Sequence, residues 1–161
     1  MIIRDERLGD QEPIHQVVLS AFDQAGEAEL VAALRRAGDG LVSLLAEDEG
    51  EIIGHVLLSR MDAPFSALAL APVSVIPARQ RKGVGSALIR EAIARARGEG
   101  WSAIFVLGDP QYYTRFGFIA EAAANFKSPY AGRHFMMLAL VETLPATEGE
   151  LRHASAFAAL A

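Results

Sequence analysis

Residues 80–86 read Gln80-Arg81-Lys82-Gly83-Val84-Gly85-Ser86, and they join a strand-like run to a helix-like run. The preceding residues 67–76 are apolar except for Ser74, and residues 84–97 carry apolar side chains at helical spacing. Two glycines let the backbone approach a ligand closely and turn its N–H groups in one direction. The first four N–H groups of the following helix are unpaired and carry about half a positive charge. The stretch therefore predicts an anion cradle, for which phosphate is the usual ligand.

The charges beside this turn favour the same interpretation. Arg79, Arg81 and Lys82 flank the glycines in a chain whose formal net charge is −5. Local charge that opposes the overall balance supports an anion site. The alternative interpretation of the same residues is a tight turn with solvated cations.

Two common nucleotide-binding turns do not fit these residues. A P-loop needs Lys-Ser/Thr directly after its last glycine, where this chain has Ser86-Ala87. A Rossmann turn needs a small residue where this chain has Leu88. It also needs an acidic residue at the end of the next strand, about twenty residues on, yet residues 103–107 are all apolar. Both nucleotide folds are therefore disfavoured.

A length of 161 residues predicts a single domain, residues 1–161. Because 52% of these residues are apolar, they are enough to form a hydrophobic core. Asp10 is expected to cap the first helix, Gly38 to end a shorter second one, and Asp48-Glu49-Gly50 to close a hairpin. The expected strands are 2–4, 41–47, 51–60, 67–76, 103–107, 135–141 and one at Phe157, and the expected helices follow Asp10, surround Leu30 to Leu34, and cover 84–97 and 110–116. Mingled helices and strands with an antiparallel hairpin predict a mixed, twisted sheet with helices on both faces.

The composition excludes several classes of protein. A net charge of −5 argues against a generic nucleic-acid or anionic-membrane binder, and the lack of cysteine excludes disulfides and thiolate chemistry. The longest apolar runs are too short to span a bilayer, and no secretory signal is visible, so a cytoplasmic protein is expected. His15, His134 and His153 lack ligand spacing, so no metal site is expected, and no Gly-x-Ser-x-Gly elbow indicates a serine hydrolase.

Two motifs together resemble a known family. Val75-Ile76-Pro77 followed by Gln80-x-x-Gly83-x-Gly85 resembles the acetyl-CoA motif of the GNAT N-acetyltransferases. Tyr113-Thr114-Arg115-Phe116-Gly117-Phe118 resembles the Tyr-x-x-x-Gly-Phe segment that follows the fifth strand in this family. One helix and one strand separate the two, as in the family. Gly108-Asp109-Pro110 and Gly149-Glu150-Leu151 look closest to the YhbS-like branch.

The resemblance implies the GNAT fold, an α+β, three-layer α/β/α sandwich around a strongly twisted mixed sheet of six to seven strands, and acetyl-CoA as co-substrate without a metal. The strand before the turn would splay from its neighbour near Pro72 and pair with the pantetheine arm, and the N–H of Val75 or its neighbour would polarise the thioester carbonyl. The backbone of residues 81–86 would receive the pyrophosphate, with the Ser86 hydroxyl as a further donor. The implied cofactor-binding residues are Val73, Ser74, Val75, Gln80, Arg81, Lys82, Gly83, Val84, Gly85 and Ser86.

The catalytic residue that the resemblance implies is Tyr113, at the position of the tyrosine that protonates the departing thiolate. A free tyrosine has a pKa of about 10 and a thiol about 8.5, so full proton transfer is uphill by roughly 2 kcal/mol. Tyr113 would then donate a hydrogen bond more than a proton, unless the short helix from Pro110 lowers its pKa. A plain aromatic core is the alternative, with Tyr112 and Phe116, four residues apart, its better candidates.

The general base is not identified by the sequence. His55 fits either a hydrogen-bonded core histidine on the face of Ile53 and Leu57 or a catalytic group. The segments expected to line the acceptor half of the cleft, Gln24–Glu29 and Asn125–Arg133, carry charges of both signs. The net charge weakly favours a cationic amine.

The prediction is an N-acetyltransferase that transfers an acetyl group from acetyl-CoA to a primary amine by direct attack in a ternary complex. The amine belongs to a small molecule or a peptide, and a homodimer is compatible with the family; no nucleic-acid or membrane partner is expected. Two alternatives stay open: a CoA-binding sensor with little turnover, and an acyltransferase that acts on a protein lysine or N-terminus.

Overall fold

The structure is a computed structural model that describes residues 1–160. Its helices are α1 (Gln11–Ala21), α2 (Gly26–Ala37), α3 (Val84–Gly98), α4 (Pro110–Tyr113) and α5 (Ala120–Ala123), with 3₁₀ turns at Pro77–Arg79, Thr114–Phe116 and Ser155–Leu160. Its strands are β1 (Ile2–Asp5), β2 (Gly40–Asp48), β3 (Glu51–Asp62), β4 (Ala67–Val75), β5 (Ala103–Leu107), β6 (Phe126–Lys127), β7 (Phe135–Ala139), β8 (Gly149–Glu150) and β9 (Arg152–His153).

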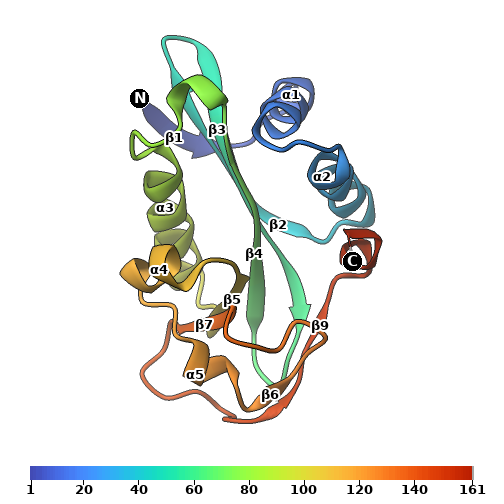
Figure 1. Ribbon diagram of the computed structural model, residues 1–161, viewed down its shortest axis with the longest axis vertical. Coiled ribbons are helices and arrows are strands. Elements are labelled where there is room, and N and C mark those ends of the chain that lie inside the picture. The colour runs from blue at the N-terminus through green and yellow to red at the C-terminus, as the bar shows by residue number, and fades with distance from the viewer. Residues whose placement is uncertain (161) are drawn as a thin grey trace.

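The main sheet has seven strands in the order β1-β2-β3-β4-β5-β7, with β9 added beside β3. Only β4 and β5 run parallel, and the other pairs in this sheet are antiparallel. Helices α1 and α2 cover one face and α3 covers the other, as Figure 1 shows. The expected mixed sheet with helices on both faces is confirmed.

The core is split between the two faces of the sheet. Ile14 and Val18 of α1 and Leu30 and Leu34 of α2 pack on one face, together with Phe105 of β5. On the other face, the apolar stripe of α3 packs on Ile53, Val56 and Leu58 of β3 and on β4. The stripe consists of Val84, Leu88, Ile89, Ala92, Ile93 and Ala96. All of these except Val84 are helical positions that the periodicity predicts to be buried.

Strands β4 and β5 pair with each other only over their first three residues and then separate. Their ladder joins Ala67–Ala69 to Ala103–Phe105, and both strands then continue without pairing with each other. Pro72, which has no N–H to donate, lies on the part of β4 that does not pair with β5. The sheet is therefore open along one edge of β4, between Leu70 and Val75.

Some local expectations were wrong in whole or in part. Asp10 is the N-cap residue of α1, as expected, but its carboxylate accepts hydrogen bonds from Arg4 and from the N–H of Arg7 and none from the helix. Helix α2, with 12 residues, is not shorter than α1, with 11. Phe157 lies in a 3₁₀ turn and not in a strand, because this one apolar residue fills the core beside α2 without any strand periodicity around it. None of the helices among residues 1–160 has both the length and the apolarity that crossing a bilayer requires.

Candidate active site

The turn between β4 and α3 presents a row of backbone N–H groups. Arg81 and Gly83 have left-handed φ angles of 64° and 88°, and α3 begins directly afterwards at Val84. Within residues 1–160, no N–H group of residues 81–86 donates a hydrogen bond of good geometry, whereas the N–H of Ala87 donates to the carbonyl of Gly83. Successive free N–H groups at the start of a helix form an anion-binding concavity. The main chain here has that geometry.

These groups border a cavity of about 470 Å³, which we name the glycine-loop cavity. Its walls come from the open part of β4, the turn, the first residues of α3, the end of α1 and the segment around α4. The lining residues are Ala21, Phe22, Val73, Val75, Arg79, Gln80, Arg81, Gly83, Gly85, Ser86, Tyr112 and Arg115.

Most of the cofactor-binding residues implied by the sequence line this cavity. Those that do are Val73, Val75, Gln80, Arg81, Gly83, Gly85 and Ser86. Three others lie elsewhere. Ser74 is buried opposite His55 on β3, since successive side chains of a strand point to opposite faces. Val84 is buried in the core under α3, and Lys82 is exposed outside the lining.

The cations of the cavity differ in how far they are compensated. Arg79 forms an ion pair of 2.8 Å with Asp48, and this hydrogen bond is the main cause that lowers the pKa of the Asp48 carboxyl. Arg81 and Arg115 form no ion pair within residues 1–160, although Arg115 donates to the carbonyl of Tyr112 and lies 4.6 Å above its ring. Two guanidinium groups are thus available to an anion in the cavity.

Tyr112 and Arg115 are site residues that the sequence reasoning missed. Tyr112 packs on Phe116 with 5.3 Å between ring centroids, as expected for a core pair, but its hydroxyl also lies 2.9 Å from the Ser86 Oγ. The sequence held one signal for Tyr112. Two consecutive tyrosines follow the Asp109-Pro110 cap, and adjacent residues of a helix point in different directions, so only one of them is expected to face the core in full. Gln80, in turn, donates its side-chain amide to the carbonyl of Val75 and fixes the turn to the end of β4.

Tyr113 lies beside the end of β5 and lines neither this cavity nor the second one described below. Its ring packs edge-on against Tyr112 and Phe118, and a Cβ on Gly108 would overlap it. Burial raises the pKa of Tyr113 to about 12. The lowered pKa that the helix from Pro110 would produce is therefore not found. The catalytic role of Tyr113 stays a prediction.

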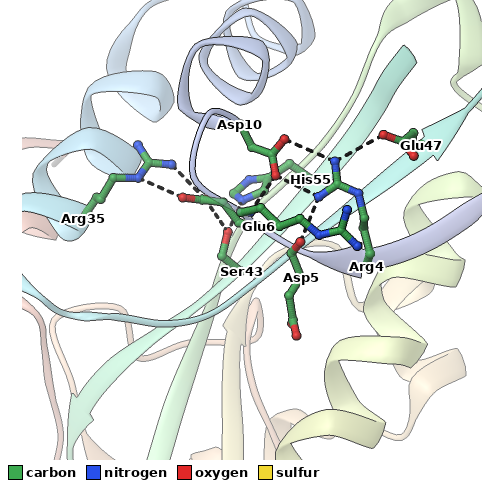
Figure 2. Close-up of polar contacts among 9 residues, drawn as sticks. Arg4, Asp5, Glu6, Asp10, Arg35, Ser43, Glu47 and His55 are labelled. Atoms are coloured by element: carbon green, nitrogen blue, oxygen red, sulfur yellow. Dashed lines mark hydrogen bonds and ion pairs between the residues drawn. The ribbon is translucent and has the colours of Figure 1, made fainter. Parts of the chain in front are cut away.

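His55 is fully buried between β2 and β4, in the polar network of Figure 2. Its Nε2 lies 2.8 Å from Ser43 Oγ. The Ser43 hydroxyl donates its proton to the Glu6 carboxylate, which also accepts a hydrogen bond from Arg35. Because Ser43 has no second proton to donate, Nε2 carries the imidazole proton and donates it to Ser43 Oγ. Burial lowers the pKa of His55 to about 4, so the ring is neutral at pH 7. These bonds favour the core interpretation of His55 over a catalytic one.

Arg4 joins the first strand to the same region. It pairs with Asp10 at 2.8 Å and with Glu47 at 3.2 Å, and Figure 2 shows it between the two carboxylates. The hydrogen bond to Arg4 is the main cause that lowers the pKa of Asp10. The network ties β1 to α1 and β2, and its groups line neither the glycine-loop cavity nor the cavity between β4 and β5 described next.

A second cavity, of about 320 Å³, lies where β4 and β5 separate, and we name it the splay cavity. It is lined by Glu27, Ala69, Leu70, Ala71, Phe105, Leu107, Tyr130, His153 and Phe157. Both cavities follow β4, the splay cavity at residues 69–71 and the glycine-loop cavity at Val73 and Val75. Over residues 1–160, no cluster of three His, Asp or Glu side chains could hold a metal ion.

Comparisons with known proteins agree with this geometry. The model of the Acetyltransferase (GNAT) family matches residues 10–118. YjhQ of Escherichia coli (strain K12), an N-acetyltransferase by name, is 42% identical over an alignment of 130 residues that covers 75% of this chain and 71% of YjhQ.

Two solved structures are similar over almost the whole chain. YhbS from Escherichia coli, in complex with CoA, has a TM-score of 0.90 and 28% identity, covering 98% of this chain and 91% of YhbS. A GNAT acetyltransferase from Brucella melitensis, in complex with acetyl-CoA, has a TM-score of 0.81 and 37% identity, covering 97% of each chain. With the matching family model and motifs, these similarities confirm the resemblance read from the sequence: the chain belongs to the GNAT family of acetyltransferases.

Proposed function

We propose that this chain transfers an acetyl group from acetyl-CoA to a primary amine while both are bound. The observation that carries the proposal is the glycine-loop cavity. The backbone N–H groups of residues 81–86 have no partner within residues 1–160, and four of these residues line the cavity together with Val73 and Val75 of β4. A diphosphate needs such a cradle, and an extended amide chain needs an unpaired strand edge. The complexes of YhbS with CoA and of the Brucella protein with acetyl-CoA support the same ligand here.

The residues present fit the two polar parts of CoA. The N–H groups of residues 81–86 would bind the pyrophosphate, and the unpaired guanidinium groups of Arg81 and Arg115 would add charge. Beyond Ala69 the β5-facing edge of β4 has no strand partner, so it can pair with the pantetheine amides. One N–H on this edge, that of Val75, would polarise the thioester carbonyl, an effect that can contribute about 3–4 kcal/mol. The N–H of the neighbouring Ile76 instead donates to the carbonyl of Ile53 on β3.

Tyr113 would act on the departing thiolate as a hydrogen-bond donor. With a pKa raised to about 12, against about 8.5 for a thiol, full proton transfer from Tyr113 would be uphill by about 5 kcal/mol. A hydrogen bond to the thiolate has no such cost. The proton that leaves the amine then reaches the thiolate or solvent without a tyrosinate forming.

The cytoplasmic location, the single domain over residues 1–161, the direct attack and the homodimer stay predictions from the sequence. They do not enter the experiment that tests the proposed function. CoA is titrated into the protein by calorimetry, and thiol release from acetyl-CoA is then followed with a panel of amines. We expect saturable binding of CoA and thiol release that depends on the amine. Absence of CoA binding would overturn the proposal, and tight binding without thiol release from any amine would favour the CoA-binding sensor.

A further inference from the structure

The splay cavity has one charged side chain in a lining that is mostly apolar and aromatic. Its lining residues include one carboxylate, Glu27, and neither a lysine nor an arginine. Phe105, Tyr130 and Phe157 supply aromatic surface, and Ala69–Ala71 supply the β4 wall. A volume of about 320 Å³ is enough for a small molecule.

Glu27 has no partner for its buried oxygen. It lies in the first turn of α2, and its Oε2 is buried without any donor from residues 1–160. No ion pair in that part of the chain includes it. A buried carboxylate oxygen without a donor is unfavourable, whereas a bound cation with N–H groups satisfies it. The cavity therefore has the electrostatics of a site for a single ammonium group.

His153 supplies no competing positive charge. Its ring packs edge-on against Tyr130, with 4.8 Å between centroids, and against Phe157, with 5.2 Å. Burial lowers the pKa of His153 to about 4, so the imidazole is neutral at pH 7, and its Nδ1 is a second buried atom without a partner among residues 1–160. The other walls of the cavity suit an apolar or aromatic body.

The position of the cavity suits an acceptor. Ala71 lines the splay cavity and Val73 the glycine-loop cavity, and two residues of a strand span about 6–7 Å. Because β4 and β5 do not pair with each other beyond Ala69 and Phe105, no ladder closes the space between the two strands there. A molecule in the splay cavity therefore lies beside the part of β4 that would hold the acyl group.

We propose that the splay cavity binds the acceptor, and that the acceptor is a small amine with one positive charge and an apolar or aromatic body, whose ammonium group pairs with Glu27. The ammonium must give one proton to the Glu27 carboxylate or to solvent before the neutral amine attacks the thioester. The inference rests on the proposed function for the identity of the donor. A polycation such as kanamycin would leave most of its charges facing apolar walls, and an amino acid with an acidic side chain would meet Glu27 with like charge. Both are expected to be poor ligands.

The test uses 2-phenylethylamine as the probe, titrated by calorimetry into the protein with and without saturating CoA. We expect Glu27→Gln to weaken its binding and to raise its KM for acetyl transfer by about 10- to 100-fold, with the affinity for CoA unchanged. Glu29→Gln is the matched control, because Glu29 is exposed in the same first turn of α2 and does not line the cavity. The neutral analogue 2-phenylethanol should bind equally well to the wild type and to Glu27→Gln.

The outcomes separate this inference from the proposed function. If the wild type binds no CoA, the proposed function is wrong, and the amine titration without CoA still tests the cavity. If CoA binds and is used but 2-phenylethylamine does not bind, the acceptor class is wrong. The role of Glu27 would be overturned if Glu27→Gln and the wild type bound 2-phenylethylamine equally well. It would also be overturned if Glu27→Gln lost as much affinity for 2-phenylethanol as for 2-phenylethylamine. Tighter binding of kanamycin than of 2-phenylethylamine would overturn the expected single charge.

Discussion

The glycine-loop cavity and the splay cavity lie along the same strand but are built from different parts of the chain. The first takes its polar groups from the backbone of consecutive residues, 81–86, next to one end of β4. The second takes its character from side chains of α2, β4, β5, the Tyr130 segment, β9 and the last 3₁₀ turn. A single substitution changes the chemistry of the second cavity easily, whereas the N–H groups of the first persist under almost any side-chain replacement. Donor binding and acceptor choice are therefore expected to vary independently.

Gly85 gives the largest expected effect, and it tests the donor side alone. A Cβ at Gly85 would lie 3.6 Å from the Tyr112 hydroxyl and from Val75 Cγ2, which is ordinary contact, so Gly85→Ala is tolerated. The longer side chain of Gly85→Leu would extend from there into the cavity and displace the pyrophosphate. Losing two charge-assisted hydrogen bonds predicts a loss of CoA affinity of about 100-fold or more, measured by calorimetry.

The paired variants sharpen the comparison between the cavities. Gly85→Ala should retain CoA affinity within a few-fold, and both variants should bind 2-phenylethylamine without CoA as the wild type does. A similar loss of CoA affinity in both variants would point to the backbone of α3 instead of the space in the cavity. A loss of amine binding in Gly85→Leu would show that the two cavities are not independent.

The same contrast explains what the sequence could predict. Residues 80–86 determine a turn by themselves, because glycines permit left-handed φ angles and the helix start leaves N–H groups free. The apolar periods of β3, β4 and α3 likewise predicted the sheet and its main helices correctly. The family motif then linked the turn to acetyl-CoA, which no local rule contains.

The splay cavity could not be predicted in this way. Glu27, Tyr130 and His153 meet there only because β9 adds to β3 and the last turn packs on α2. Strands of two residues, such as β6 and β9, are too short to show a period in the sequence. The acceptor segments Gln24–Glu29 and Asn125–Arg133 each contribute a residue to the lining, yet nothing in their charges singled out Glu27 or Tyr130.

Tyr113 gives the next largest expected effect, and it should change turnover without changing either cavity. Because its hydroxyl would donate a hydrogen bond and not a full proton, we expect Tyr113→Phe to lower kcat by about 10- to 100-fold. The affinities for CoA and for 2-phenylethylamine should stay within a few-fold, because Tyr113 lines neither cavity. Steady-state kinetics with calorimetry checks both. A loss of kcat beyond four decades would show that the thiolate requires a full proton from Tyr113.

His55 tests whether the buried network of Figure 2 is independent of both cavities. Because burial lowers its pKa from 6.5 to about 4, the folded chain binds fewer protons than the unfolded chain between these values. The contribution of His55 to stability is complete above pH 6.5 and is lost as the pH falls toward 4. Because of His55, we expect the free energy of unfolding to fall by about 2 kcal/mol between pH 7 and pH 5, measured by urea denaturation.

The variant His55→Gln should fall less steeply over that range, since its amide does not titrate. His134→Gln, at an exposed position, is the matched control and should retain the slope of the wild type. His153, whose pKa is also lowered by burial to about 4, adds a slope of its own that both variants keep. At pH 7 neither variant should change the affinity for CoA. An unchanged slope in His55→Gln would show that the buried imidazole does not resist protonation.

Tyr112 gives the smallest expected effect, since it offers the glycine-loop cavity a side-chain contact and not a main-chain one. Tyr112→Phe and Ser86→Ala each remove the 2.9 Å hydrogen bond between the two hydroxyls and leave the N–H groups of residues 81–86 in place. We therefore expect CoA affinity to fall by about 2- to 10-fold in either variant, and by no more in the double variant, because the two residues share one bond. A loss as large as that of Gly85→Leu would show that side chains, and not the main chain, hold the pyrophosphate, and the contrast between the two cavities would fail.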